Sequence, residues 1–239
     1  MPGEKKSEIA SVWTRPRRQR EQLSREQIVA EAVRLLDADG IEALSMRKLG
    51  TRLDAGATSL YRHVANKDEL IELVVDEVYG ELAVPAATGA ADWREAAARS
   101  AHSLRAMILR HPWVASVLGQ VGLIHLGPNV TKMSQRMAAV YDAAGFPADE
   151  TEQALSTVIS YVIGMATSEA AYLSLIARSG KTEREFAESL PAGTAGSAGT
   201  ADAGDVRVGD PQQAREETFD YGLQRVLDGL AVRLGPVGG

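Results

Sequence analysis

A cluster of polar side chains near the N-terminus has the chemistry needed to bind a nucleic acid. The segment ATSLYRHV, residues 57–64, combines five such side chains with three aliphatic ones. Hydroxyl groups can bond to phosphates or base edges, and a guanidinium group fits the two acceptors on the edge of guanine. A tyrosine can bond a phosphate and place its ring against a thymine methyl group. The polar residues are Thr58, Ser59, Tyr61, Arg62 and His63.

Two short helical patterns must position this cluster. Ser45 is a suitable N-cap for a helix from Met46 to about Leu53, and a further helix is expected over about 57–63. Asp54-Ala55-Gly56 interrupts the pattern, and aspartate tolerates the left-handed conformation of a tight turn. Two helices joined by so short a turn are typical of a helix-turn-helix, whose second helix enters the major groove. Its inward-facing residues are predicted to be Leu49, Leu53, Leu60 and Val64.

Capping signals define the neighbouring helices. Ser24 and Gln27 fit a capping box, and Gly40 is suited to the C′ position of the helix that follows. Asn66 can cap a further helix that carries Leu70. The N-terminal domain is therefore expected to span 23–83. A structural reading remains open for Tyr61 and His63, which could clasp the helical core instead of contacting DNA.

The N-terminal part of the chain is more basic than the rest. Residues 1–67 hold 13 Lys and Arg against 9 Asp and Glu, whereas the whole chain has a formal net charge of −6. We interpret residues 1–22 as a flexible basic arm, which could follow phosphates or remain a plain disordered end. A basic N-terminal segment on an otherwise acidic chain indicates that this segment meets a polyanion, although an uneven distribution of charge also arises by chance.

The remainder of the chain is predicted to be helical. Helices are expected over about 93–109, 129–144, 151–179 and 211–234, and no alternating strand pattern occurs. The segment PAGTAGSAGTADAGD predicts a flexible loop at about 191–210. The fold class is therefore all-α, with a three-helix helix-turn-helix domain followed by a larger helical domain over 84–239. Small residues along 151–179 allow close helix approach, so this helix and the last one could form an intersubunit four-helix bundle.

Composition limits the alternatives. The chain of 239 residues has no cysteine, which excludes disulfides and thiolate chemistry and is compatible with a reducing cytoplasm. No uninterrupted apolar run approaches the roughly 20 residues that span a bilayer. An all-helical enzyme is the rival class, but no G-x-S-x-G motif or phosphate-binding glycine loop is found. A ligand-free architectural DNA protein is the second rival, and the acidic body argues against it.

Three motifs give the sequence a specific resemblance. They are IEALSMRKL at 41–49, SLYRHV at 59–64 and NKDEL at 66–70. Residues 24–80 resemble the DNA-binding domain of the tetracycline-repressor (TetR) family of bacterial transcription regulators. The last helix, FDYGLQRVLDGL at 219–230, is similar to the closing helix of the branch nearest to the tetracycline repressors. The resemblance implies a homodimer that binds a palindromic operator with reading heads about 34 Å apart.

The resemblance also implies roles for single residues. Arg47 matches a base-reading position, whereas Thr58, Ser59 and Tyr61 match positions that read bases or backbone. His63 and Lys67 match phosphate contacts, and we add Ser45, Lys48 and Arg62 to this DNA-binding set. The chain departs from the family pattern at Asp54, Gly56 and Ala57. The helix at about 57–63 is therefore expected to read fewer bases directly, and more of the sequence recognition is expected to come from Arg47 and from DNA shape.

The second domain is expected to bind a small-molecule effector that releases the DNA. Methionine and aromatic side chains can line an adaptable apolar pocket, although more often they are ordinary core. His125-Leu126-Gly127 resembles a metal-binding turn of the tetracycline-sensing members of the family. Those members place an acidic partner on the long helix, but the corresponding position here is Ser168, next to Glu169. A lone histidine is a weak ligand set, so neither a metal nor another cofactor is predicted. The effector-site candidates are His102, Met107, Trp113, Met133, Met137, Tyr141, Tyr161 and Met165.

Overall fold

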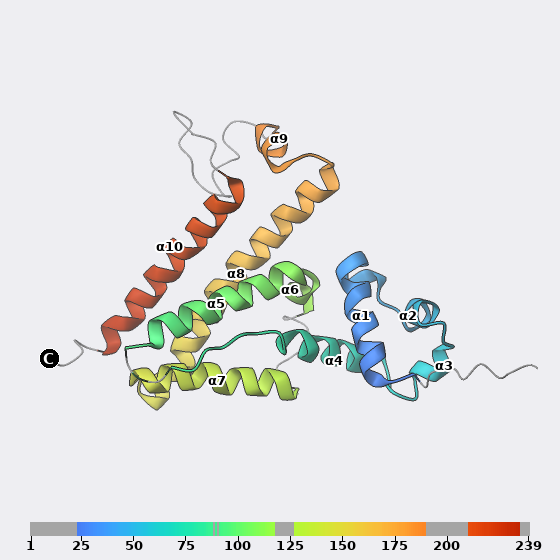
Figure 1. Ribbon diagram of the computed structural model, residues 1–239, viewed down its shortest axis with the longest axis horizontal. Coiled ribbons are helices and arrows are strands. Elements are labelled where there is room, and N and C mark those ends of the chain that lie inside the picture. Colours follow the sequence, from blue (N-terminus) through green and yellow to red (C-terminus); the bar gives the residue numbers. More distant parts are fainter. Residues whose placement is uncertain (1–22, 88, 90, 118–126, 190–209, 235–239) are drawn as a thin grey trace, which may run out of the picture.

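The computed structural model describes residues 23–87, 89, 91–117, 127–189 and 210–234. Every regular element within these ranges is a helix, so the prediction of an all-α chain is confirmed (Figure 1). The predicted basic arm (1–22), almost all of the predicted loop (191–210), and His125 and Leu126 lie outside the described residues.

The N-terminal helices gather at one end of the molecule, on the right in Figure 1. Their caps match the sequence: Ser24 and Gln27 form the predicted capping box, and the side chains of Ser45 and Asn66 accept hydrogen bonds from the first turns of the helices they precede. Gly40 ends the first helix with φ 76°. The elements are α1 (Arg25–Asp39), η1 (Ile41–Ala43), α2 (Met46–Arg52), α3 (Ala57–Leu60) and α4 (Lys67–Tyr79).

The C-terminal helices form the larger part of the fold. The four long helices were predicted, although α8 begins earlier than expected, at Ala148 after Pro147. Two short helices, α6 and α9, were not predicted. The elements are α5 (Trp93–Arg110), α6 (Trp113–Val117), α7 (Pro128–Ala144), α8 (Ala148–Ser179), α9 (Glu183–Glu188), α10 (Pro211–Ala231) and η3 (Val232–Leu234).

One continuous apolar core joins the two groups of helices. Helix α5 packs against α7 and α8, α10 packs against α8, and α4 links the groups by packing against both α1 and α7. Helix α10 can approach α8 closely because Gly222 faces Tyr161, whose hydroxyl donates to the carbonyl of Phe219 at 2.8 Å. A Cβ atom at Gly222 would lie only 2.2 Å from that hydroxyl oxygen, so this position has no room for a side chain.

Helix α8 has a surface that the protomer leaves largely uncovered, and many of its exposed residues are small or polar, such as Ser156, Ser160 and Gly164. Its length and composition would be sufficient to cross a membrane, yet only 22% of its most apolar window is buried. The buried residues, such as Val158, Val162 and Ala166, pack into the core, and Glu169 binds arginine side chains of α5 and α10. These contacts attach one part of the surface of α8 to the helical core, and many of its other residues are exposed in the protomer.

Candidate nucleic-acid interface

The helix-turn-helix is fastened to α1 by apolar packing and by ion pairs. Leu49, Leu60 and Val64 are buried, and Leu53 packs against them while partly exposed, as predicted. On the polar side of α2, Arg52 binds Glu31 and Lys48 Nζ lies 3.0 Å from Asp39 Oδ2. Burial opposes ionisation of Glu31, but hydrogen bonds from Arg52 and Arg34 outweigh it and hold the pKa of this carboxyl below its usual value. The position of α2 is therefore set by α1.

The turn between α2 and α3 depends on two backbone features. Asp54 adopts φ 47°, the left-handed conformation expected for a tight turn. The N–H of Ala55 donates to the carbonyl of Gly50 at 2.9 Å, and a Cβ atom at Gly50 would lie 2.8 Å from the Ala55 carbonyl oxygen. Our sequence reasoning gave Gly50 no role, although a glycine inside a helix next to a turn is a known signal of close packing.

Helix α3 is shorter than predicted. It was expected to continue to His63 but ends at Leu60, which leaves four helical residues. The chain then tightens, because the N–H groups of both His63 and Val64 point at the Leu60 carbonyl, at 2.9 and 3.0 Å. So short a helix has no stability of its own and is held by the buried Leu60 behind it.

The candidate DNA-binding residues on these elements differ in exposure. Thr58, Tyr61 and Arg62 are exposed, with 51% of Tyr61 accessible, while Ser59 and His63 are half-buried. Arg47 is exposed on the first turn of α2, and Lys67 is exposed at the start of α4.

Ser45 and Lys48 also make contacts within the protein. The Ser45 hydroxyl accepts the N–H of Lys48 at 3.2 Å, so it caps α2. The ammonium group of Lys48 is paired with Asp39, yet its side chain remains 45% exposed and can turn to a new partner. Surface ion pairs of this kind contribute about 0–1 kcal/mol, so exchanging Asp39 for a phosphate would cost little.

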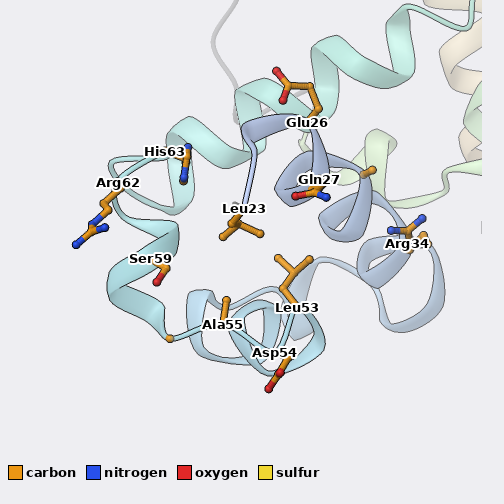
Figure 2. Close-up of a pocket in the computed structure, with 12 residues that line it drawn as sticks. Leu23, Glu26, Gln27, Arg34, Leu53, Asp54, Ala55, Ser59, Arg62 and His63 are labelled. Carbon is orange, nitrogen blue, oxygen red and sulfur yellow. The ribbon is translucent and has the colours of Figure 1, made fainter. Parts of the chain in front are cut away.

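A groove of about 1060 Å³ lies between α1, the turn and α3. Figure 2 shows Leu23 and Leu53 pointing toward its centre, with Ser59 of α3 and His63 of the following turn at one side. Glu26 at its rim is held ionised, because hydrogen bonds from its own backbone N–H and from Ser24 lower its pKa. A shallower depression of about 410 Å³ lies between Arg47 and the turn.

The effector-site candidates do not all lie in one environment. Met107, Trp113, Met133, Met137 and Tyr141 are buried in the helical core, whereas Tyr161 and Met165 are partly buried against it. His102 lies on the surface instead, where its Nε2 is 2.8 Å from Asp220 Oδ1 of α10 and its side chain is 44% exposed.

The hydroxyl of Tyr141 is a buried polar group with an unusual environment. It is 1% exposed, its ring packs against Trp93 and Phe146, and its oxygen has no hydrogen-bond partner among the residues that the structure describes. Burial raises the pKa of this phenol, so it remains a neutral donor. Buried hydroxyls are normally bonded, and the exceptions often mark a place where another molecule binds.

Glu169 is committed to other side chains. Both of its oxygens accept from Arg105 at 2.8 Å, and one also accepts from Arg215 Nε at 3.0 Å. The guanidinium of Arg105 also stacks over the Phe219 ring at 5.0 Å. The carboxylate next to Ser168 therefore joins α5, α8 and α10 and is neutralised there by two arginines.

Comparisons with known proteins agree with this arrangement. A family model described as "Bacterial regulatory proteins, tetR family" matches residues 28–74. A second, described as "Tetracyclin repressor-like, C-terminal domain", matches residues 84–234. An HTH-type transcriptional regulator of Saccharopolyspora erythraea is 36% identical over 228 residues, which cover 94% of this chain and 93% of the relative.

Solved structures share the whole architecture. ActR from Streptomyces coelicolor, in complex with actinorhodin, has a TM-score of 0.66 and 27% identity, and the match covers 90% of this chain and 99% of ActR. BioQ, crystallised with its double-stranded DNA operator, has a TM-score of 0.61 and 26% identity, over 88% of this chain and 99% of BioQ.

Proposed function

Because the chain belongs to the TetR family of bacterial transcription regulators, we propose that it is a ligand-responsive repressor that binds a palindromic operator as a homodimer. The observation that carries this proposal is the helix-turn-helix itself. The aliphatic side chains of Leu60 and Val64 are buried, and the polar side chains of Thr58, Tyr61 and Arg62 are exposed. A helix that enters a major groove needs both a buried face that holds it in place and an exposed polar face that contacts the DNA.

We assign DNA contacts to the exposed polar group. Arg47, at the first turn of α2, reads a base edge, while Tyr61 and Arg62 contact bases or backbone. Lys67 and His63 bind phosphates, and Lys48 exchanges Asp39 for a phosphate when DNA arrives. Ser45, Thr58 and Ser59 supply hydroxyl contacts. The related BioQ, crystallised with its operator, supports duplex DNA as the partner.

The dimer uses α8 and α10. The uncovered surface of α8, whose small side chains allow close helix approach, supports contact with a partner protomer, as do the exposed apolar side chains of Leu175, Tyr221 and Val232. The four helices from two protomers would bury these side chains and hold two reading heads about one turn of DNA apart. Within each protomer, residues 23–83 act as the DNA-binding domain and 84–239 as the effector and dimerisation domain.

An effector binds among the helices of the C-terminal domain. Five of the eight candidate residues are buried there, and the unpartnered hydroxyl of Tyr141 offers a hydrogen bond to a polar group of the effector. ActR, solved with actinorhodin, is a related protein that carries a small molecule. The effector acts only through its different affinities for the DNA-binding and released states. We place the protein in the cytoplasm, where DNA and a diffusible effector are both accessible.

A gel-shift titration tests this function. The probe is a palindromic duplex that the chain itself selects from a randomised library, and the measurement compares it with a scrambled duplex. Arg47→Ala is expected to remove the preference for the selected duplex, while size-exclusion chromatography still gives a dimer. Arg99→Ala is the matched control, since Arg99 is an exposed arginine of α5 whose ion-pair partner among the described residues is its helical neighbour Glu95. Equal preference in the Arg47 variant and the wild type would contradict the proposal.

A further inference from the structure

A buried histidine connects the two domains. His111 is the C-cap residue of α5, just before α6. Its backbone N–H donates to the carbonyl of Met107 at 2.9 Å. The residue is only 6% exposed. Its imidazole does not face the apolar core but contacts two elements that lead to the helix-turn-helix, namely α1 and the connector that follows α4.

Both ring nitrogens of His111 face carboxylates. Nδ1 lies 2.7 Å from Asp37 Oδ1 of α1, and Nε2 lies 3.2 Å from Glu81 Oε1 of the connector. The indole Nε1 of Trp113, in α6, donates to the same Asp37 oxygen at 2.7 Å. The second oxygen of Glu81 binds Arg110 of α5 at 2.8 Å. We call His111, Asp37, Glu81 and Trp113 the interdomain clasp.

The clasp has different hydrogen bonds in the two protonation states of its histidine. A neutral imidazole donates from one nitrogen only, so its other lone pair would face a carboxylate lone pair. An imidazolium donates from both nitrogens and satisfies both carboxylates. The charges also balance only in that state, because Asp37 and Glu81 carry two negative charges and Arg110 supplies one positive charge. Helix α6, with the sequence WVASV, brings no other charged group.

We propose that His111 is a positioning residue that holds the DNA-binding domain against the C-terminal domain through a proton-dependent clasp. When the imidazole loses a proton, the shorter bond to Asp37 keeps the remaining N–H, and Trp113 supports that bond. The contact with Glu81 then loses its donor. The connector after α4 is thereby released from the α5–α6 junction, while α1 stays attached.

The clasp reaches the reading head through α1. Asp37 is six residues beyond Glu31, the carboxylate that binds Arg52 of α2. At the other end, Glu81 lies two residues beyond the last residue of α4, Tyr79, and the first residue of α4 is Lys67, which is exposed. A change at His111 therefore acts on both helices that flank the recognition elements. The effect on DNA binding rests on the proposed function, whereas the clasp itself does not.

Nuclear magnetic resonance of the full chain tests the clasp without DNA. The ring nitrogens of the four histidines are labelled with ¹⁵N, and those of His111 are identified by their loss in His111→Gln. The ring-nitrogen signals of His111 show at each pH whether one nitrogen or both carry a proton. The amide signals of Glu81 and its neighbours should change together with those ring signals. A His111 ring that stays neutral throughout overturns the proposal. So does a Glu81 amide signal that stays constant while the His111 ring signals change.

Operator affinity then tests the consequence. The Kd of the self-selected duplex is measured at about pH 6 and about pH 8 for the wild type, His111→Gln and Glu81→Gln. The pH dependence of the wild type is expected to exceed that of both variants by about three- to tenfold. Its sign identifies whether the DNA-bound or the released state holds the clasp. His63 is present in all three proteins, so any contribution that it makes cancels from the comparison.

His102→Gln is the matched control, since His102 pairs with Asp220 on the surface of the C-terminal domain. Its pH profile should follow the wild type. Melting curves confirm that each variant folds, and Glu81→Gln leaves both His111 and its bond to Asp37 in place. Parallel profiles for the wild type and His111→Gln overturn the positioning role. A chain that selects no duplex contradicts the proposed function instead, and the ring-nitrogen measurement still decides the clasp.

Discussion

Asp76 of α4 caps the first turn of α7, because its Oδ1 accepts the backbone N–H of Asn129 at 2.9 Å. The same oxygen accepts the N–H of Val130 at 3.0 Å, and the Asn129 side chain returns a bond to the Asp76 carbonyl. The residue at the N-cap position of α7 is Gly127, which has no side chain to do this. A carboxylate from the helix that leaves the DNA-binding domain therefore fixes the start of a helix in the second domain.

Removal of this carboxylate should loosen the contact between α4 and α7. Asp76→Ala is expected to lower the free energy of unfolding by about 1–2 kcal/mol, the usual cost of losing a helix cap. Urea denaturation measures the change. Glu77→Ala alters the next residue of α4, which is exposed, and should change the same free energy by less than about 0.5 kcal/mol. Equal effects of the two substitutions would show that Asp76 does not act as a cap.

The close approach of α10 to α8 predicts opposite effects for two glycines of one helix. Gly222→Ala should lower the free energy of unfolding by about 1–3 kcal/mol, because the new Cβ atom meets the Tyr161 ring. Gly229→Ala should raise it by about 0.5–1 kcal/mol, because that Cβ atom meets nothing within 4 Å and alanine favours the helix. Thermal melting of both variants provides the comparison. A stabilising Gly222→Ala would contradict the described packing.

Two tyrosines of the C-terminal domain should respond differently to loss of the hydroxyl. Tyr141→Phe removes a group without a described partner, so the free energy of unfolding should stay the same or rise by up to about 1 kcal/mol. Tyr161→Phe removes the bond to the Phe219 carbonyl and should cost about 1 kcal/mol. Denaturant titrations of the effector-free protein measure both. A marked loss of stability in Tyr141→Phe would mean that its hydroxyl already has a partner within the protein.

The ion pairs around Glu169 predict a large effect from a small substitution. Glu169→Gln leaves Arg105, whose side chain is 10% exposed, without a countercharge and should cost about 3–5 kcal/mol. Glu152→Gln changes an exposed residue of the same helix and should cost less than about 0.5 kcal/mol. Urea unfolding of the two variants is the test. A loss below about 1 kcal/mol in Glu169→Gln would show that the arginines find other partners.

Local signals predicted the helix boundaries of the N-terminal domain well. Ser24, Ser45 and Asn66 cap the helices that follow them, and Asp54 takes the left-handed turn. Each of these features depends on residues within four positions along the chain, which is the range over which a sequence pattern carries direct information. The helix α9 had a signal of the same kind that we did not use, since Thr182 and Glu185 form a capping box.

Contacts between distant residues could not be predicted in this way. His102 was assigned to the effector pocket, but its partner Asp220 belongs to a helix more than a hundred residues later. The bonds of His111 to Asp37 and of Asp76 to α7 also depend on how whole helices pack. The early end of α3 was not predicted either, because a helix continued to His63 would equally place Val64, four residues after Leu60, on the buried face.

The buried aliphatic residues that hold α3 in place, Leu60 and Val64, are different residues from the exposed polar ones that could contact DNA. Substitutions on the outer side therefore carry little folding penalty, while those on the inner side are costly. In evolutionary terms, a duplicated copy of this chain could acquire a new target site by a few outward changes and inherit its scaffold intact. The same separation lets a designer rewrite regulatory specificity without repairing the protein afterwards.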